Sequence, residues 1–139
     1  MLARVFTKSM KSKDWQDLCI HRVIGSLNDG TAVYEPPVCY VSGPMTDVPD
    51  LNFPLFKQVT RALRDEGFMV YCPTEINPHQ DTAWGECMRN DIRGLCNCTV
   101  IVMLPGWKNS KGATLEHHIA ERLEMVVVEL QQKDIDQLL

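Results

Sequence analysis

The sequence predicts an α/β fold, a doubly wound three-layer sandwich with helices on both faces of a mostly parallel sheet. Short apolar runs alternate with segments of helical periodicity between residues 38 and 130, which is the order β-α-β-α-β-α-β. The chain has 139 residues, enough for one sizeable core and too few for two ordinary domains. We therefore expect one α/β domain at 38–139, preceded by an extension of unknown role at 1–37.

The first crossover is predicted between residues 38 and 72. "VCYVSG" (38–43) is a short apolar run that stops at a Gly-Pro pair, as a buried parallel strand does before a turn. A helix follows, with Asn52 as its N-cap and Gly67 just beyond its end. Its apolar stripe contains Leu55, Phe56, Val59, Ala62 and Leu63. "FMVYC" (68–72) predicts the next strand, which completes a parallel βαβ unit.

Two more crossovers are predicted in the second half of the chain. A polar loop at 73–82 leads to a helix that Asp81 or Thr82 can cap. The buried stripe of this helix contains Met88, Ile92 and Leu95. "CTVIVML" (98–104), rich in β-branched residues, predicts a central strand. The last helix is expected to bury Leu115, Ile119, Ala120 and Leu123, and "MVVVEL" (125–130) supplies the last strand.

The extension does not continue this pattern. "DWQDLCIHRVIGSL" (14–27) is compatible with a short helix and "TAVYE" (31–35) with a strand. The first residues contain no apolar region of signal-peptide length, and no run reaches the roughly 18 apolar residues of a membrane-spanning helix. We therefore expect a soluble, cytoplasmic protein with no membrane partner.

Charge and cysteine pattern exclude several classes of partner. The formal net charge is −4 and the basic residues are scattered apart from "KSMKSK", so a nucleic-acid polymer is not expected. The six cysteines show no repeated spacing, which indicates reduced and largely buried thiols. Cys96 and Cys98 have no second pair, and the adjacent His117 and His118 diverge by about 100° on a helix. We expect no metal site.

Three segments are predicted to end at the ligand-binding edge of the sheet, beyond the carboxyl ends of the strands. They are "YVSGPM", "CPTEINPHQD" and "MLPGWKNSKGATLE". In the third, Gly112 allows a tight turn, and Ser110 with the first free N–H groups of the helix suits a phosphate or a sugar hydroxyl. Neither a G-x-G-x-x-G nor a P-loop motif is present, which disfavours dinucleotide binding and nucleoside-triphosphate hydrolysis.

Glu116 lies one turn into the last helix, on the stripe of Ala120, and should tilt toward the sheet and the pocket. By spacing alone, a surface glutamate favoured by the helix dipole is the commoner case. An aspartate such as Asp91 is also more often paired with a neighbouring arginine than catalytic. Trp84 and Trp107 flank the same edge, where they either stack on a ligand or cover the core.

The stretches "CYVSGPMT" (39–46), "WGECMRNDIRGLCNCTVIVMLPGW" (84–107) and "NSKGATLEHHIAERL" (109–123) together resemble the nucleoside 2-deoxyribosyltransferase superfamily. That superfamily includes the 2′-deoxynucleoside 5′-phosphate N-hydrolases. The most similar branch looks like small phage- and bacterium-associated domains of unknown function. The similarity covers roughly residues 38–130, and it implies a Rossmann-like or flavodoxin-like fold.

The resemblance also implies roles for individual residues. Glu116 would be the nucleophile that attacks the anomeric carbon, Tyr40 would position it, and Asp91 would contact or protonate the base. Cleavage of an N-glycosidic bond builds an oxocarbenium-like sugar, which an ionised carboxylate stabilises and then bonds. Ser110 would hold a 5′-phosphate. The implied substrate contacts are Ser42, Gly43, Pro44, Met45, Trp84, Ser110 and Gly112, without a cofactor.

The leading hypothesis is therefore an N-glycosidase or deoxyribosyltransferase that acts on a deoxynucleoside or its 5′-monophosphate. One alternative is a catalytically inactive nucleotide-binding protein, a sensor or sequestering protein. It is supported by "EHH" at 116–118, where the family has a glycine after the nucleophile. Another is a structural or interaction protein with a vestigial pocket. The resemblance further implies a homodimer or larger homo-oligomer.

Overall fold

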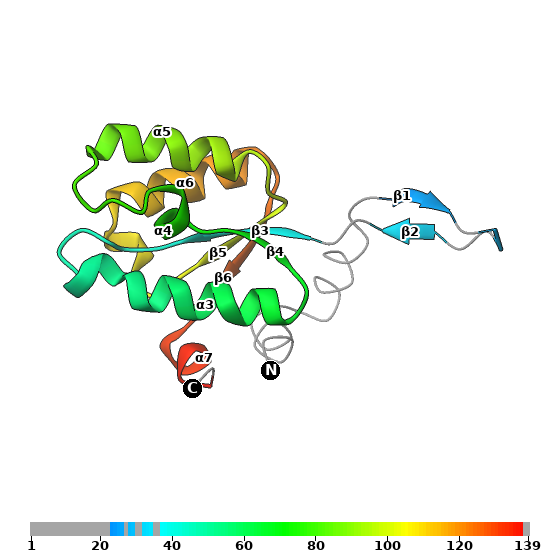
Figure 1. Cartoon of the computed structure of the whole chain (residues 1–139), viewed down its shortest axis with the longest axis horizontal. Coiled ribbons are helices and arrows are strands. Elements are labelled where there is room, and N and C mark those ends of the chain that lie inside the picture. The colour runs from blue at the N-terminus through cyan, green and yellow to red at the C-terminus, as the bar shows by residue number, and fades with distance from the viewer. Residues whose placement is uncertain (1–22, 27, 30–31, 35–36, 138–139) are drawn as a thin grey trace.

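A four-stranded parallel sheet in the order β4-β3-β5-β6 forms the centre of the molecule (Figure 1). The computed structural model describes residues 23–26, 28–29, 32–34 and 37–137. The strands of the sheet are β3 (Val38–Ser42), β4 (Met69–Tyr71), β5 (Val100–Met103) and β6 (Val126–Glu129). The predicted doubly wound α/β fold is confirmed, and "CTVIVML" supplies a central strand as expected.

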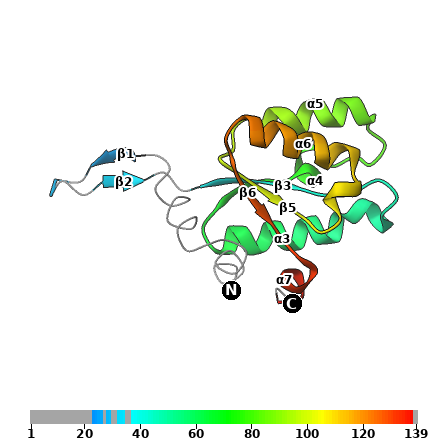
Figure 2. The ribbon, with the colours of Figure 1, turned by 180° about the vertical axis from the view of Figure 1, so that it is seen from behind.

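Helices cover both faces of this sheet, as the two opposite views in Figures 1 and 2 show. One face carries α5 (Trp84–Leu95) and α6 (Lys111–Arg122). The other carries α3 (Phe53–Asp65) and α7 (Gln132–Asp136), a short helix that was not predicted. The 3₁₀ turns η1 (Pro49–Asn52) and η2 (Trp107–Asn109) precede α3 and α6.

Two hydrophobic clusters fill the spaces between the three layers. On the α3 side, Cys39 and Val41 of β3 belong to a cluster with Phe56, Val59, Leu63 and Leu130. On the α5 and α6 side, Tyr40 belongs to a cluster with Leu95, Ile101, Met103, Ala113 and Ala120. Because side chains alternate along a strand, β3 sends Tyr40 and Ser42 toward the face that α6 covers.

The end of α3 has the predicted glycine signature. Gly67 adopts a φ of 92°, and its N–H donates to the carbonyl of Arg64 at 2.9 Å. The N–H of Phe68 donates to the carbonyl of Leu63 at 3.2 Å. This pair of bonds is a Schellman motif, which reverses the chain and leads directly into β4.

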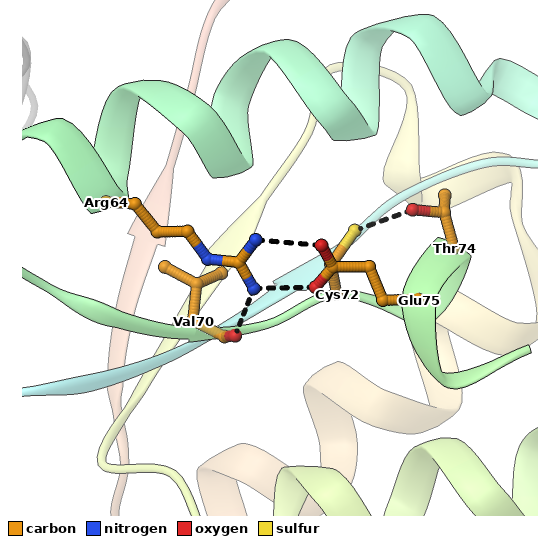
Figure 3. Close-up of polar contacts among 5 residues, drawn as sticks. All are labelled: Arg64, Val70, Cys72, Thr74 and Glu75. Carbon is orange, nitrogen blue, oxygen red and sulfur yellow. Dashed lines mark hydrogen bonds and ion pairs between the residues drawn. The ribbon is translucent and has the colours of Figure 1, made fainter.

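Arg64 then ties the end of α3 to the next two elements (Figure 3). Its Nη1 and Nη2 donate to the two carboxylate oxygens of Glu75 at 2.8 and 2.6 Å, and Nη2 also donates to the carbonyl of Val70 at 3.0 Å. Glu75 lies in α4 (Pro73–Ile76), a single turn that follows β4. Both side chains are about half exposed, so the ion pair helps to orient α3 and α4 but adds little to the stability of the fold.

One of the two predicted helix starts is confirmed and the other is wrong. Asn52 is the N-cap residue of α3, as predicted, although its side chain donates to the carbonyl of Pro44 at 3.0 Å and makes no capping hydrogen bond. Neither Asp81 nor Thr82 caps α5, whose N-cap is Ala83. The loop predicted at 73–82 begins with α4, because Pro73 is a favourable first residue for a helix.

The predicted buried stripe of α6 was also partly wrong. Leu115 and Leu123 are 39% and 53% exposed. The buried residues of α6 are Ala113, Glu116 and Ala120. The buried face of α6 therefore contains a carboxylate. For this reason it differs from the apolar face that the hydrophobic pattern predicts.

The extension contains an antiparallel hairpin, which lies clear of the α/β core in both views (Figures 1 and 2). Its strands are β1 (Val23–Ser26) and β2 (Ala32–Tyr34). The strand predicted in "TAVYE" is confirmed. The helix predicted at 14–27 is wrong at 23–26, and the rest of it lies outside the described residues. No helix among those that the structure describes is long and apolar enough to cross a membrane.

None of the described cysteines forms a disulfide. Cys39, Cys72 and Cys98 are buried, whereas Cys96 is exposed and Cys87 is partly buried.

Close packing at Gly43 gives a test of the fold. A Cβ at this position would lie 2.7 Å from the Cβ of Leu104, so Gly43→Ala should lower the free energy of unfolding by about 1–3 kcal/mol. Gly85→Ala in α5 is the matched control, because the nearest atom there is the Arg89 Nη1 at 3.7 Å. Urea unfolding should show a loss for the first variant and no loss for the second. Equal stabilities would contradict the close approach.

Candidate active site

A cavity of about 860 Å³ opens where the connections after β3 and β5 diverge. The strand order reverses between these neighbours, since β3 leads to α3 on one face and β5 leads to α6 on the other. Such a switch point is where open α/β sheets bind ligands. Eight of the predicted site residues line the cavity: Gly43, Pro44, Met45, Trp84, Asp91, Ser110, Gly112 and Glu116.

The carboxylate of Glu116 is held by two hydroxyl groups of β3. Tyr40 donates from its phenol to Oε2, and Ser42 donates from Oγ to Oε1 at 2.8 Å. Glu116 is only 4% exposed, and both donors are fully buried. Tyr40 and Ser42 do not themselves line the cavity but lie behind Glu116. The structure thus brings together three residues that lie up to 76 positions apart in the sequence.

This environment changes the acidity of the group. Burial raises the pKa of Glu116 to about 7 from its ordinary value of 4.5, and the hydrogen bonds from Tyr40 and Ser42 act in the opposite direction. Burial, followed by the negative charge of Glu116, raises the pKa of Tyr40 well above its ordinary value. The phenol therefore stays a neutral donor while the carboxylate titrates near neutral pH.

Asp91 is the second carboxylate of the cavity, 7% exposed on the buried side of α5. Its Oδ1 accepts a hydrogen bond from the Asn77 Nδ2 at 2.8 Å, and no arginine of the described residues forms an ion pair with it. Burial, followed by the charge of Glu116, raises the pKa of Asp91 to about 8, and the Asn77 hydrogen bond acts to lower it. Two acidic groups of raised pKa thus share one cavity.

The loop before α6 presents the start of that helix to the cavity. Ser110 is the N-cap, and its Oγ accepts from the N–H of Ala113 at 3.1 Å. The hydroxyl hydrogen of Ser110 stays available to a ligand, because the cap uses the oxygen only as an acceptor. A Cβ on Gly112 would approach the Met88 Sδ to 3.2 Å, so a small residue is favoured where α6 passes α5.

The two tryptophans that were predicted to flank this edge have different surroundings. Trp84 lines the cavity and is 44% exposed. The Lys111 ammonium lies over its ring, 4.2 Å from the ring centroid. Trp107 does not line the cavity. It stacks on His117 at 4.3 Å between ring centroids, and its Nε1 donates to the Glu129 Oε1 at 3.0 Å. Trp107 therefore covers the core, and of these two residues Trp84 is the one placed to contact a ligand.

The two histidines that follow Glu116 have little influence on the cavity. His117 packs on Trp107 and lies 3.6 Å from the Glu121 carboxylate, and His118 is exposed. Neither histidine lines the cavity. The bulk of these two side chains, where the superfamily that the sequence resembles has a glycine, therefore points away from the cavity. Within the described residues, no group of three His, Cys, Asp or Glu side chains is placed to hold a metal ion.

Sequence reasoning missed two parts of the wall. One is the segment before α3, where Leu51 and Phe53 line the cavity. It is shaped by left-handed backbone at Asp50, Leu51 and Asn52, with φ between 51° and 61°, and the sequence gives no signal for that. The other part, Asn77, His79 and Gln80, lies in a loop that was predicted to reach this edge. The polar side chains of this loop were the feature of the sequence that could have identified these residues as part of the cavity wall.

A family model matches most of the α/β core. The family model described as "Domain of unknown function (DUF4406)" matches residues 37–129. The match spans the four-stranded sheet from β3 to β6 and contains every site residue named above. No curated protein matches the chain.

The raised pKa of Asp91 predicts a measurable cost in stability. Between its ordinary value of 3.8 and about 8, the folded protein keeps a proton that the unfolded chain releases. Stability from this group is therefore lost as pH rises through that window. Asp91→Asn should exceed the wild type in free energy of unfolding, by a margin that grows between pH 5 and 8 by on the order of 1 kcal/mol or more.

Thermal or urea unfolding at several pH values checks this prediction. Asp81→Asn, which removes an exposed carboxylate from the preceding loop, controls for the change in net charge. A margin for Asp91→Asn that does not vary with pH would contradict the assignment of the pKa.

Proposed function

Because the chain belongs to the DUF4406 family, whose description assigns no activity, we propose its function from the geometry of the site. The protein cleaves the N-glycosidic bond of a deoxynucleoside or a deoxynucleoside 5′-monophosphate through a covalent glycosyl-enzyme intermediate on Glu116. The observation that carries this proposal is the buried Glu116 carboxylate, held by the Tyr40 and Ser42 hydroxyls at the wall of a cavity that Asp91 also lines.

The resemblance to the nucleoside 2-deoxyribosyltransferase superfamily supports the same assignment. In that superfamily, a glutamate early in the helix after the glycine-containing loop is the nucleophile, and a tyrosine near the end of the first strand positions it. Glu116 in the second turn of α6 and Tyr40 in β3 occupy the matching positions and bond to one another. Sequence pattern and geometry therefore point to the same pair of residues.

Glu116 is suited to the role of nucleophile. Its two hydrogen-bond donors favour the ionised form and fix the orientation of the carboxylate. As the bond between C1′ and the base breaks, positive charge develops on the sugar, and an adjacent carboxylate stabilises it before the ester bond forms. The low exposure of Glu116 strengthens this electrostatic effect, because little water screens it.

Asp91 is suited to the complementary role of general acid. Its pKa of about 8 keeps it protonated at neutral pH, so it can donate a proton to the departing base. In the second half of the reaction, the Asp91 carboxylate accepts a proton from the nucleophile that attacks the glycosyl ester. If that nucleophile is water the protein is a hydrolase, and if it is a second base the protein is a transferase.

The start of α6 favours a substrate with a 5′-phosphate. Ser110, Lys111 and Gly112, at the N-terminus of α6, line the same cavity. A helix N-terminus with a hydroxyl and an ammonium group nearby is a favourable place for a phosphate. Trp84, which lies under Lys111, offers an aromatic face beside it.

The alternative of an inactive nucleotide-binding protein loses its main support in this geometry. That alternative rests on the bulk of His117 and His118 after the nucleophile, and neither side chain lines the cavity. The nucleophile, its two donors and the candidate acid are all present. The test below nevertheless separates binding from turnover.

Release of free base is the direct test of the proposed activity. The purified protein is incubated with a panel of deoxynucleosides and their 5′-monophosphates, and free base is followed by chromatography. Glu116→Gln should lower the rate by roughly 1,000-fold or more, because it removes the nucleophile. Glu121→Gln, at an exposed position of the same helix, should retain the wild-type rate. If no substrate releases base but one raises the melting temperature, the protein belongs to the binding class.

The pH dependence of kcat/KM gives a second test. The rate should fall below about pH 7 as Glu116 takes up a proton, and fall above about pH 8 as Asp91 loses one. Tyr40→Phe removes a hydrogen bond that lowers the pKa of Glu116, so the acid limb should move to higher pH. An acid limb at the wild-type position in Tyr40→Phe would mean that the Glu116 ionisation does not control it.

A further inference from the structure

A row of side-chain hydrogen bonds runs from the surface of α5 to Asp91. The Arg93 Nη1 donates to the Asn90 Oδ1 at 2.9 Å, and the Asn90 Nδ2 donates to the Asn77 Oδ1 at 3.0 Å. The Asn77 Nδ2 then donates to the Asp91 Oδ1 at 2.8 Å. Three bonds thus connect an exposed guanidinium group to a buried carboxyl group.

The direction of this row is fixed by chemistry at its outer end. A guanidinium group can only donate, so Asn90 must turn its oxygen toward Arg93 and its nitrogen toward Asn77. Asn77 then presents its own oxygen to Asn90 and its nitrogen to Asp91. The same nitrogen donates to the backbone carbonyl of Cys87 at 3.3 Å, which only accepts. Both ends of the row therefore require the same orientation of the Asn77 amide.

This orientation distinguishes the two oxygens of Asp91. Oδ1 faces a donor and accepts its hydrogen, so a proton on Oδ1 would oppose the Asn77 N–H. Among the described residues, the side-chain hydrogen bond of Asp91 is made through Oδ1, and Asp91 lines the cavity. Oδ2 is the oxygen that remains for the proton and for a bound molecule.

We propose that Asn77 is a positioning residue, which fixes Asp91 so that Oδ2 carries the proton delivered to the substrate. The proposal rests on the function proposed above. Asn77 acts through Asp91, and Asn90 and Arg93 act through Asn77 by holding its amide in one orientation. The loop at 73–82 thereby has a chemical role.

The proton is accounted for in both half-reactions. In the first, the bond from C1′ to the base breaks, its electron pair goes to the base nitrogen, and the base takes the Oδ2 proton of Asp91. A carboxylate oxygen of Glu116 supplies the electron pair of the new bond to C1′. In the second, water or another base attacks C1′, the ester bond returns its electrons to Glu116, and the released proton returns to Oδ2.

The groups around Asp91 explain why one amide donor matters. Glu116 faces it from α6, Tyr40 from β3, and Cys87 from its own helix. None of these three groups is a cation, and the charge of Glu116 raises the pKa of Asp91. Asn77 supplies the hydrogen bond that opposes this increase. Loss of the donor should therefore raise the pKa of Asp91 further.

The first test needs no substrate. The side-chain carboxyl carbon of Asp91 is followed by NMR during a pH titration of ¹³C-labelled protein, with Asp91→Asn to identify the signal. The titration midpoint of Asp91 should move to higher pH in Asn77→Ala than in the wild type. It should also move in Asn90→Ala, which leaves Asn77 in place but removes the group that orients it. Midpoints unchanged in both variants would overturn the proposal.

The second test is kinetic and uses Asn90, which does not line the cavity. Asn90→Asp keeps an acceptor for Arg93 but has no hydrogen to give to Asn77, whose amide should rotate and turn its oxygen toward Asp91. We expect kcat to fall about 10- to 100-fold with KM changed less than about threefold, since proton donation is impaired and contacts to the substrate are kept. A wild-type kcat would overturn the proposal.

The matched control is Asn97→Asp, which adds the same charge near Arg93. Asn97 donates to the carbonyl of Arg93 at 3.1 Å but is outside the row, so this variant should keep the wild-type kcat. A variant with an altered fold is recognised by circular dichroism, and Asn90→Ala then replaces Asn90→Asp in the assay. If no substrate is turned over, the proposed function fails, whereas the NMR titration still decides whether Asn77 controls Asp91.

Discussion

The buried carboxylate of Glu116 is the constraint on which the other features of the site depend. A charge between α6 and the sheet costs free energy unless hydrogen bonds replace the lost water. Tyr40 and Ser42 supply these bonds, and both must come from the same face of β3. The alternate residues Cys39 and Val41 then face α3 and belong to the other apolar cluster. One five-residue strand thus serves a polar site on one face and a core on the other.

The position of β3 within the sheet determines where this site opens. Because β4 and β5 lie on opposite sides of β3, the chain leaves β3 and β5 toward different faces. The space between the diverging connections is the cavity. Gly43 allows the first connection to pass close to Leu104, which follows β5. The segments that follow β3 and β5 therefore pack against each other at Gly43 and Leu104. As a result, the cavity begins directly at the carboxyl ends of these two strands.

Most of the fold could be predicted, because buried parallel strands are continuous apolar runs and the helices between them keep a regular period. Two of the errors concern the site and have a physical reason. Leu115 and Leu123 are exposed because Glu116 takes the inward position on α6, and a hydrophobic pattern cannot represent a buried charge. Asn77 was missed because its importance comes from Asp91 and Asn90, contacts that only the folded chain creates.

The two carboxylates of the cavity differ in surroundings more than in type. Glu116 has two hydroxyl donors that favour its anion, whereas Asp91 has one amide donor and faces the charge of Glu116. On a rise in pH, the first proton therefore leaves Glu116, and its loss makes the second harder to remove from Asp91. The state with one anion and one acid is the one that the proposed glycosyl transfer requires. The roles of Glu116 as nucleophile and of Asp91 as acid therefore follow from the hydrogen bonds that each carboxyl group accepts.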